Sequence, residues 1–124
     1  MSIFSDVNQL FEKMDFPTAE VPSFLHPDLM HGRVMFLEEE LHETCEAYGH
    51  ADLPEVIDGL IDLIYVATGM LQLMGVDGQK HWDEVHAANM RKVPGVKEGR
   101  DMEFDMRKPK GWVGPDHQRI LDET

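Results

Sequence analysis

Two glutamates at helical spacing are the first residues in the sequence that suggest chemistry. Glu40 and Glu43 are three residues apart, with Glu39 beside them, so their carboxylates project from neighbouring turns of one helix face. Such carboxylates can ligate a cation or take a proton from a water molecule. The acidic run 38–40 by itself is more typical of a solvated helix face, so the interpretation depends on a second group.

That second acidic group follows in the next predicted helix. Glu55, Asp58 and Asp62 fall within about 60° of one another at 100° per residue, and the two aspartates lie in the most apolar segment of the chain. An unpaired carboxylate in apolar surroundings is strongly unfavourable. The alternatives to a ligand role are hydrogen bonds to Tyr or His across a core, or salt bridges to the later basic residues.

Few side chains can neutralise these carboxylates. Residues 1–79 hold 15 acidic residues and only two bases, Lys13 and Arg33. A divalent cation can do so instead, and hard oxygen ligands from two facing helices suit Mg²⁺ or Mn²⁺. Two such ions could clamp the attacking and leaving oxygens of a phosphoryl or pyrophosphoryl transfer. A di-iron site would need Glu-x-x-His pairs, which Glu43 does not provide, and the histidines show no zinc-ligand spacing.

Composition narrows the class of protein further. The 124 residues carry a formal net charge of −13, which belongs to residues 1–79, because residues 80–124 hold nine acidic and nine basic residues. This charge repels phosphate backbones and anionic lipid, so nucleic-acid and membrane partners are not expected. No apolar run approaches the ~20 residues of a membrane span, no signal peptide is recognised, and Cys45 has no partner for an internal disulfide. We expect a cytoplasmic protein.

Hydrophobic periodicity predicts the elements that position the carboxylates. Apolar residues recur at helical spacing in several segments, and prolines between residues 16 and 30 predict an extended connection. Asp52 is the expected N-cap of the most apolar helix. Strand alternation is lacking, so the predicted fold class is all-α, a four-helix bundle within one domain, 1–124. The expected helices cover 3–15, 33–49, 52–75 and 76–93, the helical core spans about 30–94, and residues 95–124 form a loop-like tail.

The segment 52–75 also bears on assembly. Its apolar residues cover nearly the whole circumference of the predicted helix, which is typical of a buried helix. Four helices of this length hardly cover it. We therefore expect a homo-oligomer, either a dimer or a tetramer.

At this point the motifs resemble the MazG-like all-α nucleoside triphosphate pyrophosphohydrolases, which include phosphoribosyl-ATP pyrophosphohydrolase and dimeric dUTPases. EEELHE (38–43) is similar to the family's EExxE, and DGLIDLIYVATG (58–69) and VHAANMRK (85–92) match further family segments. KPKGWVGPD (108–116) is similar to the closing tail of small stand-alone phage and bacterial members. A phage origin would place the protein in the host cytoplasm. The likeness covers roughly residues 30–116.

The resemblance implies hydrolysis of a nucleotide between its α and β phosphates, giving a monophosphate and pyrophosphate. It implies Mg²⁺ as the cofactor, with Mn²⁺ as the substitute, and a role for Glu40, Glu43 and Asp62 as metal ligands. Glu39, together with Glu40 and Glu43, is the expected catalytic group, since a carboxylate beside the ligands can orient the attacking water as general base.

One position departs from the family pattern. The usual Glu three residues before Asp62 is Gly59 in this chain. Asp58 or Glu55, which lie on the same predicted face, would then supply the missing oxygen. The predicted metal ligands are therefore Glu40, Glu43, Asp58, Asp62 and Glu55.

Basic residues after the acidic part are the expected substrate contacts. The resemblance places Asn89, Arg91 and Lys92 where they can hold phosphate or base, although the two bases also complement a helix C-terminus. In the functional interpretation of the tail, it folds over the triphosphate and Trp112 stacks on a base. The alternative is a tail that docks on a neighbouring subunit or is partly disordered. The tail carries the bases Lys97, Arg100, Arg107, Lys108 and Lys110, and the further candidate contacts in it are Lys108, Lys110 and Trp112.

The identity of the base is not encoded in a recognisable motif. Likeness to the small phage members favours purine deoxynucleotides, dGTP and dATP. The alternatives are house-cleaning hydrolysis of dUTP or dCTP, and a non-enzymatic acidic helical adaptor that binds a basic partner.

Overall fold

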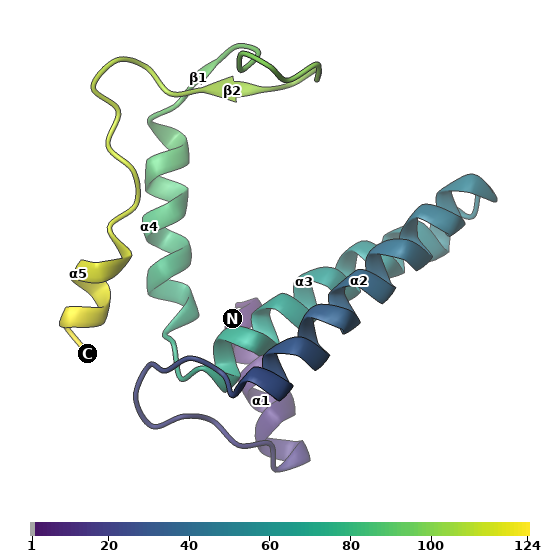
Figure 1. Cartoon of the computed structure of the whole chain (residues 1–124), viewed down its shortest axis with the longest axis vertical. Helices are drawn as coiled ribbons and strands as arrows, with labels where there is room; N and C mark the ends of the chain where they lie inside the picture. Colours follow the sequence, from purple (N-terminus) through teal and green to yellow (C-terminus); the bar gives the residue numbers. More distant parts are fainter. Residues whose placement is uncertain (1) are drawn as a thin grey trace. The chain divides into compact units, whose positions relative to one another are not determined.

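The computed structural model describes residues 2–124 and is all-α with little strand (Figure 1). Its contacts divide it into two compact units, Met1–Gly78 and Gln79–Thr124. The described residues form five helices and one two-stranded antiparallel sheet. These are α1 (Ile3–Met14), α2 (Pro27–Gly49), α3 (Leu53–Leu73), α4 (Gly78–Met90), β1 (Val93–Pro94), β2 (Met106–Arg107) and α5 (His117–Asp122).

Helix ends follow from local capping chemistry. Asp52 caps α3 as expected, since its Oδ1 accepts a hydrogen bond from the Glu55 amide at 3.3 Å. The second helix, however, begins at Pro27, about one and a half turns before the expected start near Arg33. The sequence analysis treated Pro27 as a helix breaker, whereas proline at the first helical position loses no intrahelical hydrogen bond.

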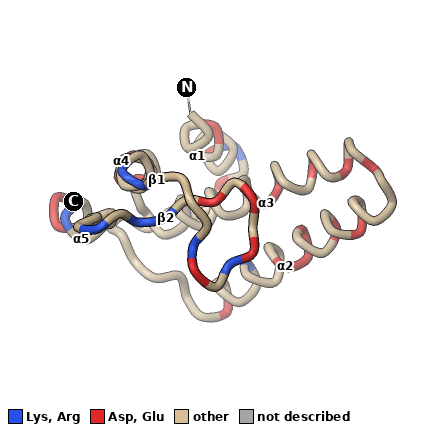
Figure 2. The backbone as a smooth tube through the Cα atoms, turned by 90° about the horizontal axis from the view of Figure 1, so that it is seen from above, with Lys and Arg blue, Asp and Glu red and all other residues tan. Residues whose placement is uncertain are grey.

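Helices α2 and α3 of the first unit form an antiparallel pair, and α1 packs against α3 (Figure 1). The buried core beneath α1 consists of Val7, Phe11 and Leu73. Two glycines of α3 permit close approach at these contacts. A Cβ on Gly69 would lie 2.9 Å from Phe11 Cζ, and one on Gly59 would overlap Thr44 Oγ1. Figure 2 shows Asp and Glu residues along both α2 and α3.

As expected, the helices of a single chain do not cover the apolar circumference of α3. Its side chains Ile57, Leu60, Ile61 and Ile64 are each about half exposed, between 49% and 55%. The physical reason is that only α1 and α2 pack against α3 within its unit. Two neighbours cannot cover the whole circumference of a helix.

By length and composition alone, α3 could cross a membrane, which the sequence analysis did not expect. Core helices of soluble proteins pass the same test. Asp58 and Asp62 stand in the middle of this helix, where a charged side chain would be costly in a bilayer. One such helix does not indicate a membrane protein.

The tail is more regular than the expected loop. β1 and β2 pair with Val93 opposite Arg107 and Pro94 opposite Met106. Asp105 holds the connecting loop, because its carboxylate accepts hydrogen bonds from the amides of Lys97 (2.9 Å) and Met106 (2.8 Å) and from Arg100 Nη1 (3.0 Å). These donors lower the pKa of Asp105, although burial opposes them. This single side chain, 2% exposed, organises the loop.

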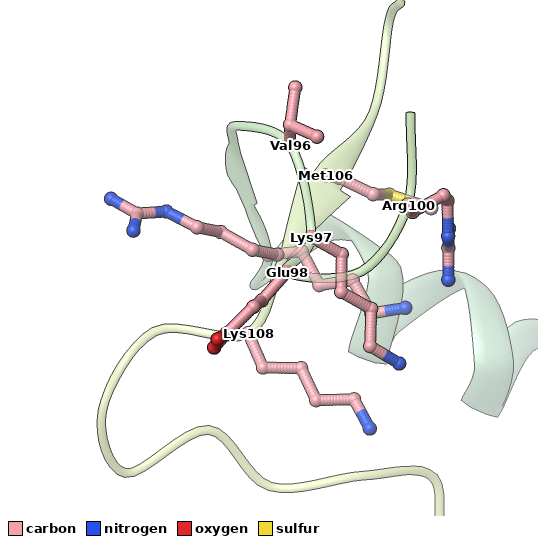
Figure 3. A pocket seen from close by; sticks show the side chains of 8 residues that line it. Val96, Lys97, Glu98, Arg100, Met106 and Lys108 are labelled. Atoms are coloured by element: carbon pink, nitrogen blue, oxygen red, sulfur yellow. The ribbon is translucent and has the colours of Figure 1, made fainter. Parts of the chain in front are cut away.

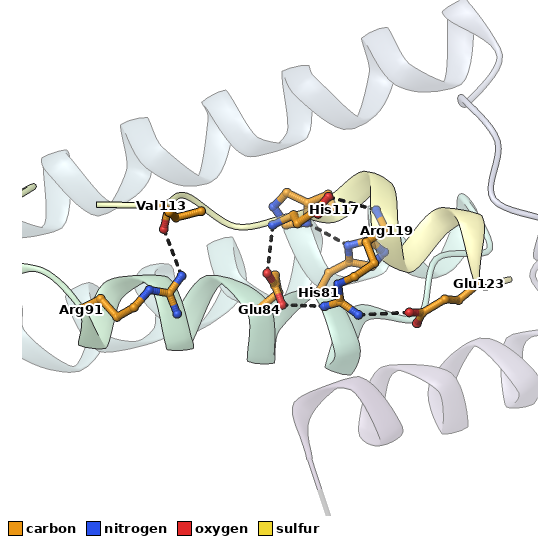
Figure 4. Close-up of polar contacts among 8 residues, drawn as sticks. His81, Glu84, Arg91, Val113, His117, Arg119 and Glu123 are labelled. Carbon is orange, nitrogen blue, oxygen red and sulfur yellow. Dashed lines mark hydrogen bonds and ion pairs between the residues drawn. The ribbon is translucent and has the colours of Figure 1, made fainter. Parts of the chain in front are cut away.

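The last helix, α5, is bound to α4 by a polar network (Figure 4). Arg119 pairs with Glu84 at 2.9 Å and with Glu123 at 3.1 Å. Glu84 also accepts the Asp116 amide at 2.9 Å, and this bond, with Arg119, lowers its pKa. The imidazoles of His81 and His117 approach to 2.8 Å between their Nδ1 atoms. These contacts give the end of the tail a defined structure on α4.

The approach of α2 to α3 at Gly59 can be tested by adding one methyl group. We predict that Gly59→Ala lowers the free energy of unfolding by roughly 1–2 kcal/mol, because overpacking costs about 1–3 kcal/mol and helix propensity returns at most ~1 kcal/mol. Urea unfolding followed by circular dichroism measures the difference. Gly32→Ala in α2 is the control, since no atom lies within 4 Å of its Cβ position. Equal stability of the two variants would contradict the packing described here.

Candidate functional site

A pair of carboxylates bridges α2 and α3. Glu40 and Asp62 are both partly buried and line the same cavity, and Asp62 is near enough to raise the pKa of Glu40. Partial burial raises the pKa of Glu40, and the charges of Asp62, Glu43 and Glu39 raise it further. The structure thus brings together one residue from each acidic segment identified in the sequence.

The other predicted carboxylates are less closely assembled. Glu39 and Glu43 are exposed on α2, near enough to Glu40 to raise its pKa. Glu55 and Asp58 are exposed on α3, and no side-chain hydrogen bond or ion pair within residues 2–124 joins them to the pair. Over the same residues, no group of three or more His, Cys, Asp or Glu side chains is placed to hold a metal ion. The site as built therefore offers two close carboxylates, fewer than the five ligands expected.

This donor set is nonetheless compatible with Mg²⁺. Magnesium is commonly held by one or two carboxylates, with water and substrate phosphate oxygens in its remaining positions. Among residues 2–124, no ion pair neutralises Glu40, Glu43 or Asp62. Two neighbouring carboxylates without a cationic partner, one of them with a raised pKa, suit a site that a divalent cation completes.

The structure also explains the departure at Gly59. This residue faces α2 at Thr44, whose Oγ1 donates a hydrogen bond to the Glu40 carbonyl oxygen at 2.7 Å. Because a Cβ at position 59 would overlap that hydroxyl, a longer acidic side chain does not fit there while Thr44 is present. The absence of a carboxylate at position 59 therefore follows from the packing of α2 against α3.

A cavity of about 300 Å³ adjoins the carboxylate pair. Glu40 and Asp62 form part of its wall, and the remainder is mostly apolar and aromatic with one guanidinium. Sequence analysis did not assign these residues to the site. Helical spacing is a signal that identifies several of them. Residues 36 and 65 lie one turn from Glu40 and Asp62, respectively, and residues 33 and 69 lie two turns from them. The other lining residues are Leu10, Phe11, Phe16, Arg33, Phe36, Tyr65, Val66 and Gly69.

The predicted substrate contacts belong to the second unit, and two of them already have structural partners. Arg91 Nη2 donates to the Val113 carbonyl at 3.0 Å (Figure 4), and Trp112 Nε1 donates to the Ala88 carbonyl at 2.8 Å. The ammonium groups of Lys92 and Lys108 lie 5.3 and 4.9 Å from the Trp112 ring centre. The hydrogen bonds of Arg91 and Trp112 therefore hold the tail to α4. Asn89 is partly buried and Lys110 is exposed; their substrate roles stay predictions.

The raised pKa of Glu40 has a consequence for stability. A raised pKa in the folded state favours the protonated form, so its stabilising effect is complete below the ordinary Glu pKa of about 4.3 and is lost as the pH rises through the raised value. Glu40→Gln keeps a hydrogen-bond donor to Asp62 without the charge. We predict that, without divalent ions, this variant melts above wild type at pH 7 and that the difference disappears toward pH 4.

The control for this prediction is Glu38→Gln, which removes the same charge from an exposed position on the same helix. Thermal melts of both variants across this pH range separate a local effect from the relief of net charge. A pH-independent difference for Glu40→Gln would show that the carboxylate pair does not behave as described.

Comparison with known proteins identifies the family of the chain. No curated protein matches the chain at a significant level. A family model, phosphoribosyl-ATP pyrophosphohydrolase, matches residues 7–89, which include most of α1, all of α2 and α3, nearly all of α4 and every predicted acidic site residue. The match covers well over half of the chain, and it confirms the resemblance drawn from the motifs. The chain therefore belongs to the phosphoribosyl-ATP pyrophosphohydrolase family, within the MazG-like all-α nucleoside triphosphate pyrophosphatase superfamily.

Proposed function

We propose that this protein hydrolyses deoxynucleoside triphosphates to monophosphates and pyrophosphate with Mg²⁺ as cofactor. The observation that supports this most is the Glu40–Asp62 pair on the wall of a cavity, in a chain whose family indicates nucleotide pyrophosphohydrolase activity in general. Mn²⁺ is the expected substitute, since the same oxygen ligands suit it.

Each acidic residue has a proposed part. Glu40, Glu43 and Asp62 would hold Mg²⁺, with Asp58 or Glu55 completing the ligands through movement or water. When bound, the ion supplies positive charge against the phosphate oxygens. Glu39, exposed beside Glu40, orients a water molecule and accepts its proton as the water attacks the α-phosphorus. The bond from the α-phosphorus to the bridging oxygen then breaks, and pyrophosphate leaves.

The cavity beside the pair is the proposed base site. The rings of Phe16, Phe36 and Tyr65 offer flat apolar surface, and Arg33 offers hydrogen-bond donors. A purine presents a larger face for stacking than a pyrimidine, which favours dGTP and dATP as substrates. Preference for dUTP or dCTP is the alternative that a substrate panel would reveal.

Product analysis tests the chemistry. We predict that the eight common NTPs and dNTPs with Mg²⁺ give pyrophosphate and a monophosphate, fastest with dGTP or dATP. Glu43→Gln and Asp62→Asn should each lower kcat/KM at least 100-fold, because both remove a proposed ligand. Glu38→Gln is the matched control and should keep wild-type activity.

Release of orthophosphate instead, or full activity of both variants, would contradict the assigned reaction. Melting temperatures of the same protein with and without Mg²⁺ distinguish an enzyme from an acidic adaptor. Binding of Mg²⁺ to the folded state should raise the melting temperature of wild type more than that of Asp62→Asn, whereas an adaptor predicts no metal effect.

The exposed apolar face of α3 supports a second part of the proposal. We propose that α2 and α3 of two copies pair to form the four-helix bundle, as a dimer or as half of a tetramer. Ile57, Leu60 and Ile61 are half exposed in one chain, and their burial would be favourable at about 25 cal/mol per Å².

Light scattering after size exclusion tests this assembly. We predict a mass that is two or four times the 14.2 kDa of the chain and a smaller mass for Ile57→Asp. Val21→Asp, at an exposed apolar position between α1 and α2, is the matched control and should leave the mass unchanged. A wild-type monomer at micromolar concentration would refute the proposed bundle.

A further inference from the structure

The loop between β1 and β2 encloses a cavity of about 400 Å³, here called the hairpin pocket. Five of its eight lining residues are Lys or Arg and one is acidic. In the view of Figure 3, Lys97, Arg100 and Lys108 extend to one side, while the Glu98 carboxylate lies on the other. The lining residues are Lys92, Val96, Lys97, Glu98, Arg100, Met106, Arg107 and Lys108.

The pocket is held in shape by groups that are not themselves available to a ligand. The Asp105 carboxylate, 2% exposed, accepts the Lys97 and Met106 amides and fixes Arg100. The Gly95 amide donates to the Asp105 carbonyl at 3.1 Å. The Arg107 side chain passes over Gly95, where a Cβ would lie 3.0 Å from its Nε. Several cationic side chains are therefore positioned before any ligand arrives, which reduces the entropic cost of binding.

Most of this positive charge lacks a counterion. Within residues 2–124, Arg100 is the only pocket cation in an ion pair with a carboxylate. Lys92 and Lys108 instead lie near the Trp112 ring, which leaves their charge available. Concentrating like charges around one cavity is unfavourable unless an anion enters it.

The number and spread of these cations indicate a chain of phosphates rather than a single ion. Five cationic groups around 400 Å³ provide more donors than one tetrahedral anion accepts, and guanidinium and ammonium groups both bind phosphate oxygens well. We propose that the hairpin pocket binds oligophosphate anions, namely pyrophosphate or the triphosphate chain of a nucleotide, without a metal ion. This goes beyond the proposed hydrolysis, because it assigns a site to Lys97, Arg100 and Arg107, outside residues 7–89 of the family match.

Titration in EDTA tests the proposal apart from catalysis. The full-length protein is titrated calorimetrically with tripolyphosphate, with pyrophosphate and, at matched ionic strength, with sulfate. We expect tripolyphosphate to bind at least tenfold more tightly than sulfate. Lys97→Gln and Arg107→Gln should each weaken it at least fivefold, and the double variant more. Lys13→Gln, which removes one positive charge from α1, is the matched control and should bind as wild type does.

Further titrations identify the ligand and distinguish this proposal from the proposed hydrolysis. Glu43→Gln should bind tripolyphosphate in EDTA as wild type does, whatever its activity. In that variant, dGTP binding at least tenfold more tightly than tripolyphosphate assigns the pocket to a nucleotide, and equal affinity assigns it to the free oligophosphate. Circular dichroism checks that the pocket variants are folded. Tripolyphosphate affinity no higher than that of sulfate, or folded Lys97→Gln and Arg107→Gln variants that bind normally, would overturn the inference while leaving the proposed hydrolysis standing.

Discussion

The packing of α2 against α3 at Thr44 and Gly59 is the constraint on which the acidic site depends. Because the helices are antiparallel, this contact fixes the register of the whole pair. One turn from it toward the start of α2, Glu40 meets Asp62. One turn further, residues 36 and 66 lie on the wall of the same cavity. A glycine without chemistry of its own thus determines which carboxylates can face each other.

The acidic residues of the two units have opposite electrostatic environments. In the first unit, the carboxylates of Glu40, Glu43 and Asp62 form no ion pair with Lys or Arg among the residues that the structure describes, and Glu40 has a raised pKa. In the second unit, Glu84 and Asp105 pair with arginines and accept backbone amides, and both have lowered pKa values. Satisfied carboxylates of this kind stabilise a fold, whereas unsatisfied ones mark places where a ligand can bind. The formal charge of −13 therefore represents different physical situations along the chain.

Sequence analysis succeeded where a local rule decides the structure. Asp52 caps a helix through its own side chain, and the spacing of the acidic residues placed Glu40 and Asp62 on facing helices. It failed where distant contacts decide. The hairpin depends on Asp105, whose carboxylate accepts amides from both sides of a loop. Pro27 was misread because its effect depends on its position within the helix. The cavity residues Phe36 and Tyr65 had the right spacing, but no local rule distinguishes a cavity wall from a core.

The contact between Thr44 and Gly59 also limits which sequences this fold can reach by single substitutions. A glutamate at position 59, as in the usual family pattern, would enter the space of the Thr44 hydroxyl and separate α2 from α3. Loss of that hydroxyl alone would leave a gap between the helices and gain no ligand. The two positions must therefore change together, and selection on either one depends on the residue at the other. The ligand arrangement of this chain therefore depends on a threonine that is not itself one of the proposed ligands.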